Sequence, residues 1–233
     1  KRARELKAAG VNRVTLSLDA IDDDVFKAIN DVGYPASKVL TAIDNAKAAG
    51  LTPVKVNCVI QRGVNEDQIL PMVEHFRHSD VVLRFIEFMD VGTSNGWRME
   101  EVVTAREIVE TIRTRHAISR LPATVPGETA NRWVFDDDAG EIGIIASVSQ
   151  PFCGGCSRAR LSAIGELYTC LFGVHGRDLR TPLREGATDE ELRDQLAGIW
   201  QARDDRYSER RGEETARRNG DADGKVEMSY IGG

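Results

Sequence analysis

The chain has 233 residues, of which 41% are hydrophobic and 29% are charged, and its formal net charge at pH 7 is −6. This length suits one large domain or one and a half smaller ones, and the acidic balance argues against a nucleic-acid-binding protein, which is usually basic. Because no apolar run approaches the roughly 18 residues that cross a bilayer and no signal peptide is visible, we expect a cytoplasmic protein without a membrane partner.

The chain starts inside a helical pattern. Residues 1–9 resemble the second half of an amphipathic helix that Gly10 closes, with no Met and no capping residue in front of it. We therefore expect that the natural protein begins upstream of Lys1.

The first ninety residues alternate between strand and helix patterns. Runs rich in Val, Leu and Thr with period-two alternation predict strands over residues 11–19, 53–60 and 81–89. Helices are predicted over residues 22–30, 37–49 and 66–78, the last with Asn65 as its N-cap. Strand–helix–strand at this spacing indicates right-handed βαβ units and a parallel sheet, which fits either a barrel or a doubly wound fold.

One side of the predicted strands is polar. The alternating polar positions are Thr15, Ser17 and Asp19 in the first strand, against Val14, Leu16 and Leu18, and Lys55 and Asn57 in the second, against Val54, Val56, Cys58 and Ile60. A strand covered by helices on both faces would be apolar on both, so the polar face indicates a solvated or ligand-filled cavity. The expected fold is α/β: the C-terminal three strands of a partial TIM-type barrel, with the other strands missing or supplied by another chain, plus a small α+β C-terminal domain.

The pattern changes after Met89. The elements predicted there are a loop over residues 90–100, a helix over 104–116 capped by Thr104, a loop over 121–128, strands over 131–135 and 141–148, a hairpin of 159–163 and 166–170 around Ile164-Gly165, and a helix over 189–203. Residues 206–223 are charged and nearly free of large apolar side chains, so we expect them to be mobile. The expected domains are residues 1–100, residues 101–205, and a flexible tail over 206–233 that ends in Gly232-Gly233.

Three of the four cysteines are clustered. Cys153-Gly-Gly-Cys156 and Cys170 form a C-x2-C-x13-C pattern, in which the predicted hairpin would return Cys170 to the first pair. Clustered thiols in a reducing compartment more often bind metal or do chemistry than form disulfides. The sequence therefore predicts a metal site at these three cysteines.

The kind of metal stays open on spacing alone. A structural zinc site wants four ligands. Cys58 shares a face with Val54 and Ile60 and is better explained as a small buried hydrophobe, while His175 stays a candidate fourth ligand. Three thiolates also suit a four-iron cluster with one iron open to a ligand.

Two arginines follow the second cysteine. If Ala159 begins a strand, Arg158 and Arg160 project on the same side, beside the metal site, where guanidinium groups suit phosphate or a purine edge. A pair of solvated surface arginines explains the spacing equally well.

Longer motifs resemble a known family. The run S-V-S-Q-P-F-C-G-G-C-S-R-A-R-L-S from Ser147, with L-Y-T-C-L-F around Cys170, resembles the C-terminal cluster motif of the GTP 3′,8-cyclase family of molybdenum cofactor biosynthesis. Segments that begin at Arg13, Val54 and Arg84 resemble that family's fourth, fifth and sixth barrel strands. Asp204-Asp-Arg-Tyr-Ser208 and the final Ile-Gly-Gly also fit, so the likeness covers essentially the whole chain.

The resemblance implies a radical S-adenosylmethionine enzyme with an incomplete (βα)6 barrel, two [4Fe-4S] clusters and a homodimeric assembly. In the family, the N-terminal cluster cleaves S-adenosylmethionine, the resulting radical takes a hydrogen from the GTP ribose, and the ribose carbon bonds to C8 of guanine, which the C-terminal cluster binds at its open iron. The implied roles are ligands of the C-terminal cluster at Cys153, Cys156 and Cys170, contacts to GTP at Lys55, Arg84, Arg158, Ala159 and Arg160, and contacts to S-adenosylmethionine at Ser17 and Met89.

The residues themselves bear on some of these roles. A solvated surface charge does not explain Lys55 well, because it lies on the polar inner face of a strand. Ser17 alone would be a small residue near a strand end, and Met89 alone would be a core residue. Alternation places Arg84 and Met89 on opposite faces, so both face the cavity only if a bulge or a strand end intervenes.

The sequence departs from the family in one large feature. It contains no C-x3-C-x2-C, so the N-terminal cluster and the first three barrel strands are absent from these residues. We expect the full-length protein to be active and the 233-residue chain alone to lack the radical chemistry. The alternatives are another radical S-adenosylmethionine enzyme with an auxiliary cluster, a non-catalytic zinc-binding module that recognises a nucleotide or a partner, and a remnant that scaffolds the next enzyme of the pathway.

Overall fold

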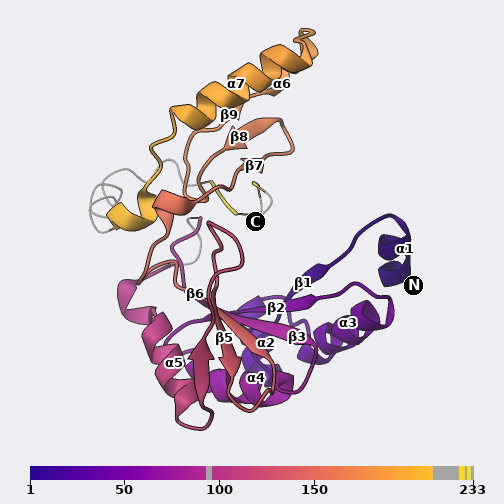
Figure 1. Cartoon of the computed structure of the whole chain (residues 1–233), viewed down its shortest axis with the longest axis vertical. Coiled ribbons are helices and arrows are strands. Elements are labelled where there is room, and N and C mark those ends of the chain that lie inside the picture. Colours follow the sequence, from indigo (N-terminus) through magenta and orange to yellow (C-terminus); the bar gives the residue numbers. More distant parts are fainter. Residues whose placement is uncertain (93–95, 212–225, 229, 232–233) are drawn as a thin grey trace. The chain divides into compact units, whose positions relative to one another are not determined.

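The computed structural model describes residues 1–92, 96–211, 226–228 and 230–231. The chain divides into two compact units, the first made of Lys1–Met89 with Arg98–Gln150 and the second of Asp90–Trp97 with Pro151–Gly233 (Figure 1). No helix in the described part of the chain has the length and apolarity that crossing a bilayer requires.

The first unit is built on a six-stranded sheet in the order β1-β2-β3-β6-β5-β4 (Figure 1). Its strands are β1 (Val14–Ser17), β2 (Val54–Ile60), β3 (Val81–Glu87), β4 (Ile118–Arg120), β5 (Asn131–Phe135) and β6 (Glu141–Ile145). The first three strands and β6 run parallel, whereas β5 and β4 extend the sheet in antiparallel pairs. The α/β class and the parallel sheet predicted from the sequence are confirmed, and the partial barrel stays a prediction.

β6 was not expected to belong to this sheet. It pairs with β3 so that Ile142 lies opposite Leu83 and Ile144 opposite Phe85, and these four side chains are at most 2% exposed. Burying an aliphatic or aromatic side chain stabilises a fold by about 1.5–3 kcal/mol, which favours this pairing across more than fifty residues. The parallel part of the sheet therefore has four strands, one more than the three predicted.

Helices cover the apolar face of this sheet. They are α1 (Arg2–Ala8), α2 (Asp23–Asn30), α3 (Ala36–Ala48), α4 (Ile69–Phe76) and α5 (Ala105–Arg113), with short turns η1 (Glu66–Gln68) and η2 (Met99–Glu101). The buried residues of α2, α3, α4 and α5 form one core with alternate residues of β2, β3 and β6. On the opposite face Thr15 and Ser17 are exposed and Lys55 and Asn57 are half-buried, which confirms the predicted polar face.

Asn65 differs from its predicted role as a helix cap. It precedes η1, but its side chain makes no capping hydrogen bond. Its Nδ2 donates to the carbonyl oxygens of Asp19 and Val59 at 2.7 and 2.8 Å, and its Oδ1 accepts from the amide of Gln61 at 2.8 Å. Asn65 is only 1% exposed. Buried backbone groups need hydrogen-bond partners, and the Asn65 side chain serves the ones around it instead of capping a helix.

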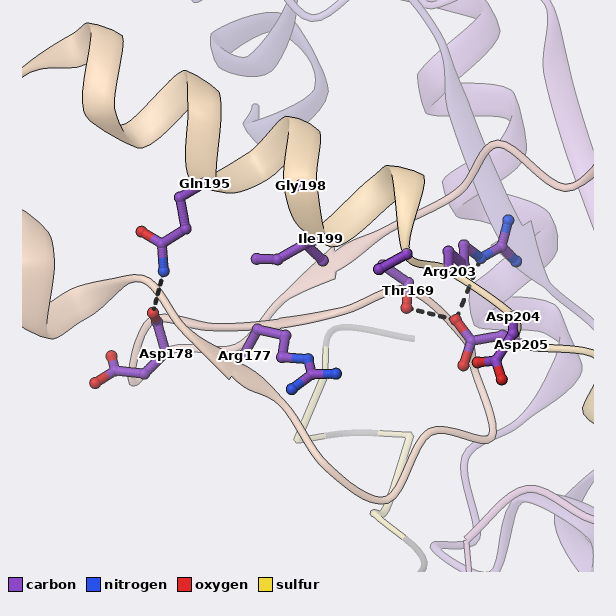
Figure 2. Close-up of a pocket in the computed structure, with 10 residues that line it drawn as sticks. Thr169, Arg177, Asp178, Gln195, Gly198, Ile199, Arg203, Asp204 and Asp205 are labelled. Carbon is purple, nitrogen blue, oxygen red and sulfur yellow. Dashed lines mark hydrogen bonds and ion pairs between the residues drawn. The ribbon is translucent and has the colours of Figure 1, made fainter.

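The second unit carries a three-stranded sheet and a long helix. Its elements are η3 (Cys153–Gly155), β7 (Arg160–Leu161), β8 (Glu166–Tyr168), β9 (Arg177–Asp178), α6 (Arg180–Arg184) and α7 (Asp189–Gln201). The predicted hairpin is confirmed, because β7 pairs antiparallel with β8 around Gly165, whose φ is +84°. Gln195 of α7 donates to the carbonyl oxygen of Asp178 at 3.1 Å and so anchors the helix on β9 (Figure 2).

The predicted mobile tail is only partly described. Residues 212–225, 229 and 232–233 lie outside the described residues, and they include most of the segment 206–223 that was predicted to be mobile. Residues 207–211, however, are helical.

The side chains at the two ends of this helical turn are buried. Tyr207 and Arg211 are 5% and 6% exposed. The Tyr207 hydroxyl donates to the Asp90 carboxylate, and Arg211 Nε lies 2.8 Å from Asp90 Oδ1. Local composition does not reveal these contacts, because the buried carboxylate lies more than a hundred residues earlier, and the mobility of the tail stays a prediction.

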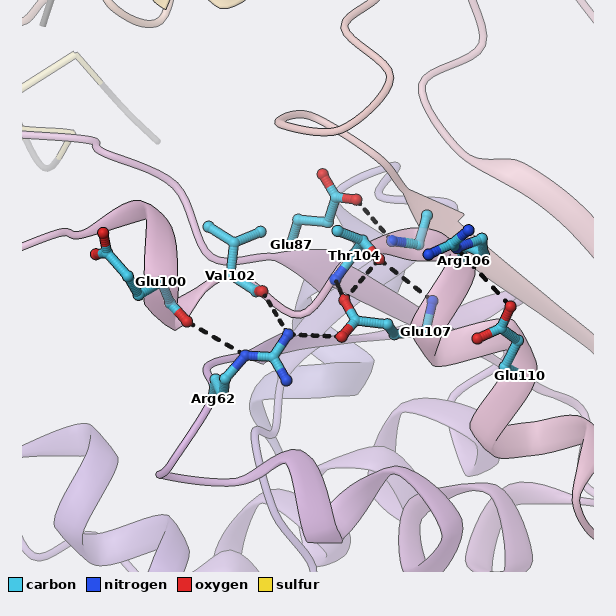
Figure 3. Close-up of polar contacts among 9 residues, drawn as sticks. Arg62, Glu87, Glu100, Val102, Thr104, Arg106, Glu107 and Glu110 are labelled. Carbon is cyan, nitrogen blue, oxygen red and sulfur yellow. Dashed lines mark hydrogen bonds and ion pairs between the residues drawn. The ribbon is translucent and has the colours of Figure 1, made fainter. Parts of the chain in front are cut away.

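The predicted cap at Thr104 is confirmed as a capping box at the start of α5 (Figure 3). Thr104 Oγ1 accepts from the Glu107 amide at 3.3 Å, and the Glu107 carboxylate accepts from the Thr104 amide and hydroxyl at 2.8 and 2.7 Å. Arg62 Nη2 donates to Glu107 Oε1 at 2.7 Å and to the Val102 carbonyl oxygen at 3.0 Å. The loop after β2 is thereby joined to the N-terminus of α5.

Glu87 holds the end of β3 to two other segments. Its carboxylate is fully buried and accepts from the amides of Ala105 at 2.7 Å, Val148 at 2.7 Å and Ser149 at 2.8 Å. Figure 3 shows it beside the first turn of α5.

We expect Glu87→Gln to destabilise the protein by about 3 kcal/mol, because the amide nitrogen would face backbone N–H donors and leave at least one of them buried without an acceptor. Urea unfolding followed by circular dichroism measures the difference. The exposed Glu100→Gln is the control and should change stability by less than about 0.5 kcal/mol. Equal effects of the two substitutions would contradict the role given to Glu87.

Glu107 predicts a pH dependence of stability. Burial alone would raise its pKa, but the hydrogen bonds from Thr104 and the ion pair with Arg62 lower the pKa from 4.5 to about 2. The stabilisation is therefore fully present above the unfolded-state pKa and is lost as pH falls toward the folded-state pKa. The stability difference between wild type and Glu107→Gln should shrink between about pH 6 and about pH 3, whereas Glu110→Gln on the exposed side of α5 should show a smaller, flatter difference.

Candidate functional site

The predicted site residues fall into two groups. Those in the first unit are Ser17, Lys55, Arg84 and Met89, and those in the second unit are Cys153, Cys156, Arg158, Ala159, Arg160 and Cys170.

A row of cross-strand neighbours brings together part of the first group. Ser17 lies opposite Asn57, Asn57 opposite Arg84, and Arg84 opposite Gly143. Since residues in register on neighbouring strands share a face, Ser17 and Arg84 lie on the same polar face with Asn57 between them.

Arg84 is held in place by its neighbours. Its Nε donates to Asn57 Oδ1 at 2.9 Å. A Cβ at Gly143 would come within 3.0 Å of Arg84 Cγ, so the glycine leaves room for the aliphatic part of Arg84. Burial and the charge of Arg13 lower the pKa of Arg84, but a guanidinium stays protonated in proteins. The arrangement presents a fixed positive charge on the polar face.

Lys55 and Arg84 line one pocket of about 230 Å³. Arg132, on the same wall, is neutralised by Glu141 through hydrogen bonds of 2.7 and 2.6 Å. No ion pair to a carboxylate of the described residues forms at Lys55 or Arg84. Burial, followed by the charges of Arg84 and Arg13, lowers the pKa of Lys55, so an anion bound here would relieve the repulsion between the two cations.

Ser17 and Met89 lie where their strands end. Ser17 is the exposed last residue of β1, and Met89 follows the last residue of β3, Glu87, by two positions. A strand end therefore intervenes between Arg84 and Met89, which is the condition for both to face one cavity.

The cysteines separate into one buried and three accessible thiols. Cys58 is fully buried, as predicted, and its thiol lies 3.6 Å from the Asp19 carbonyl oxygen. Cys153, Cys156 and Cys170 are partly exposed, and none forms a disulfide. Cys153 begins η3, Cys156 follows it, and Cys170 lies two residues beyond β8.

The two arginines lie beside these thiols. Arg158 donates from Nε and Nη2 to Cys156 Sγ at 3.3 and 3.1 Å, and its guanidinium lies 4.9 Å from the centre of the Phe152 ring. Arg160 is half-buried. Burial and the positive charge of Arg158 lower its pKa, while the thiols of Cys170 and Cys156 act in the opposite direction. The exposed Ala159 stands between them, just before β7.

The thiols differ in their electrostatic setting. Burial would raise the pKa of Cys156, but hydrogen bonds from the backbone and side chain of Arg158 outweigh burial and lower that pKa. Burial raises the pKa of Cys170. Positive charge beside Cys156 favours the thiolate form in which cysteine binds metals.

The donor chemistry fits an iron–sulfur cluster, while the geometry of a bound metal is not formed. In the described part of the chain, no three His, Cys, Asp or Glu side chains come close enough together to hold a metal ion. Three thiols nevertheless gather on one hairpin and its preceding loop, where Gly154 has no neighbour within 4 Å of a Cβ position. His175 and Cys170 line another pocket, of about 470 Å³.

Four residues that lie beside the predicted ones were missed as site residues. Asn57 holds Arg84 and Gly143 makes room for it, while Arg203 and Asp205 contact the cysteine segments. The alternation in β2 could have identified Asn57, and a glycine inside a strand indicates the close approach of another group. Arg203 ends the predicted helix over 189–203 and Asp205 lies in the Asp204–Ser208 motif that fits the family, but neither position indicates a contact with the cysteine segments.

Comparisons with known proteins show the family of the chain. A family model described as Molybdenum Cofactor Synthesis C matches residues 81–209, and the model of the Radical SAM superfamily matches residues 1–76. The chain is 45% identical to a GTP 3′,8-cyclase of Staphylococcus haemolyticus, covering 100% of this chain and 68% of the relative. Identity is 45% to the GTP 3′,8-cyclase of Acidothermus cellulolyticus, over 99% of this chain and 69% of the relative, and 47% to that of Xanthomonas campestris pv. campestris, over 100% and 67%. The chain belongs to the GTP 3′,8-cyclase family within the radical S-adenosylmethionine superfamily.

Proposed function

We propose that this chain is part of an enzyme that cyclises GTP to (8S)-3′,8-cyclo-7,8-dihydroguanosine 5′-triphosphate, the first step of molybdenum cofactor biosynthesis. The observation that carries this proposal is the 45–47% identity to GTP 3′,8-cyclases over essentially the whole chain. The proposed substrates are GTP and S-adenosylmethionine. A homodimer in the cytoplasm stays a prediction.

Lys55 and Arg84 are the proposed contacts to the GTP triphosphate. They line one pocket and make no ion pair with a carboxylate of the described residues, so their charges are available to an anion. The guanidinium of Arg84 suits two phosphate oxygens at once, while Lys55 supplies a point charge. Their work is to bind and orient the substrate.

Arg158, Ala159 and Arg160 are the proposed contacts to the rest of GTP, beside the cluster ligands Cys153, Cys156 and Cys170. When bound, a four-iron cluster on three thiolates leaves one iron open to a ligand such as the guanine base. The hydrogen bonds from Arg158 to the Cys156 sulfur support the proposed cluster site, because donors to a ligand sulfur tune the reduction potential of a cluster.

Ser17 and Met89 are the proposed contacts to S-adenosylmethionine. Both lie at the carboxyl ends of parallel strands, the edge at which ligands bind in parallel α/β folds. The sequence has four cysteines, of which Cys58 is buried in the core. The cluster that cleaves S-adenosylmethionine is therefore assigned to residues outside this sequence.

The cluster proposal predicts a specific loss in a triple variant, Cys153→Ser, Cys156→Ser and Cys170→Ser. Full-length protein, purified and reconstituted without oxygen, should lose about half its iron and stop converting GTP, because one of two clusters is gone. Slow cleavage of S-adenosylmethionine to 5′-deoxyadenosine should continue. Cys58→Ala is the control and should keep its iron. Zinc in the wild type, or normal GTP conversion by the triple variant, would show that the three cysteines are structural.

The phosphate proposal predicts weaker nucleotide binding in Lys55→Gln. Loss of one charge–phosphate contact should raise the Kd for GTP by about 10-fold or more, measured by titration calorimetry of the full-length protein. The effect should diminish as salt is raised, because added ions screen the contact. Lys38→Gln, on the exposed side of α3, should bind as the wild type does. Equal affinities of the two variants would remove Lys55 from the phosphate site.

A further inference from the structure

An ion pair at the end of α7 links the two cysteine-bearing segments of the second unit. Arg203 and Asp205 follow α7, with Arg203 Nε 3.2 Å from Asp205 Oδ2 (Figure 2). Their side chains are 12% and 29% exposed. The guanidinium of Arg203 also lies 5.0 Å from the centre of the Trp200 ring.

Each member of the pair holds a different segment. Arg203 Nη1 donates to the carbonyl oxygen of Cys156. The hydroxyl of Thr169, the residue before Cys170, donates to Asp205 Oδ2, as Figure 2 shows. A continuous chain of contacts therefore runs from Cys156 through Arg203 and Asp205 to the residue next to Cys170.

The strand ladder does not supply this link. β7 and β8 pair from Arg160 opposite Tyr168 to Leu161 opposite Leu167. Cys156 lies before this paired stretch and Cys170 after it, both at the open end of the hairpin. Their separation thus depends on contacts outside the ladder.

The helix that carries the pair is itself anchored. Gln195 of α7 bonds the Asp178 carbonyl oxygen in β9, and β9 pairs with β8. The start of the helix is fixed by a capping box between Thr188 and Glu191. α7 is therefore fixed against the three-stranded sheet. Arg203 and Asp205 follow its C-terminal end and contact the segments that flank the hairpin.

We infer that Arg203 and Asp205 are positioning residues for the cluster, which tie the Cys156 loop to the Cys170 strand end and so limit how far apart the cluster ligands on the two segments can move. The inference rests on the proposed cluster site. Groups that orient metal ligands without touching the metal typically change affinity by about 10–100-fold when they are substituted. An isolated surface ion pair would contribute little to stability and nothing to the cluster.

The test compares Arg203→Gln and Asp205→Asn with Arg193→Gln and Asp194→Asn, which change the same residue types on exposed positions of α7. Full-length holoenzyme is prepared without oxygen, and two quantities are followed: iron release to a chelator and the electron paramagnetic resonance spectrum of the reduced clusters. Arg203→Gln should release the iron of one cluster about 10-fold faster or more and change that cluster's signal alone. Asp205→Asn keeps an acceptor for Thr169 but loses the charge, so its effect should be smaller.

The readouts separate the possible failures. If wild-type protein holds only one cluster, the proposed cluster site fails, and this inference fails with it. If the wild type holds two clusters and both test variants release iron as their controls do, the inference alone is overturned. Equal losses from both clusters, with a lower unfolding temperature of the metal-free chain, would also overturn it, because they indicate a general structural role. Should Arg203→Gln fail to fold, Asp205→Asn carries the same comparison.

Discussion

The first unit depends on one buried carboxylate. Glu87 is fully buried at the end of β3 and accepts hydrogen bonds from Ala105, Val148 and Ser149. A buried charge is costly unless it is fully hydrogen-bonded, and here the first turn of α5 and the segment after β6 both supply donors. The N-terminal end of a helix also favours negative charge. One side chain therefore ties a central parallel strand to a helix start and to the last residues before Pro151.

The second unit also has a buried carboxylate, Asp90, and here an arginine side chain is one of its partners. Asp90 accepts from Tyr207 and pairs with Arg211, whose guanidinium lies within 6 Å of the rings of Trp97, Phe172 and Tyr207. The two carboxylates are three residues apart in the chain, and Met89 stands between them. The stretch that leaves β3 therefore has one hydrogen-bonded carboxylate in each unit.

Local chemistry explains what could be predicted from the sequence. The capping residue at Thr104, the hairpin at Gly165 and the polar side of β2 depend on residues within a few positions of one another, and all three are present. The pairing of β6 with β3 and the tertiary hydrogen bonds of Asn65 depend on partners far away in the chain. Period and propensity carry no information about such partners, so these features could not be predicted.

The residues of the candidate site also separate into those that the sequence could predict and those that it could not. The spacing of the cysteines and the alternation around Lys55 mark residues that would touch a ligand directly, because ligand chemistry restricts residue type and spacing. Residues that hold those groups face no such restriction. Arg211 lies in the charged run over residues 206–223, which composition assigns to solvent, and Arg203 and Asp205 precede this run directly. Their charges are instead compensated pairwise, by one another or by Asp90. Whether a charged run is solvated or structural therefore depends on where its counter-charges lie, which only the folded chain reveals.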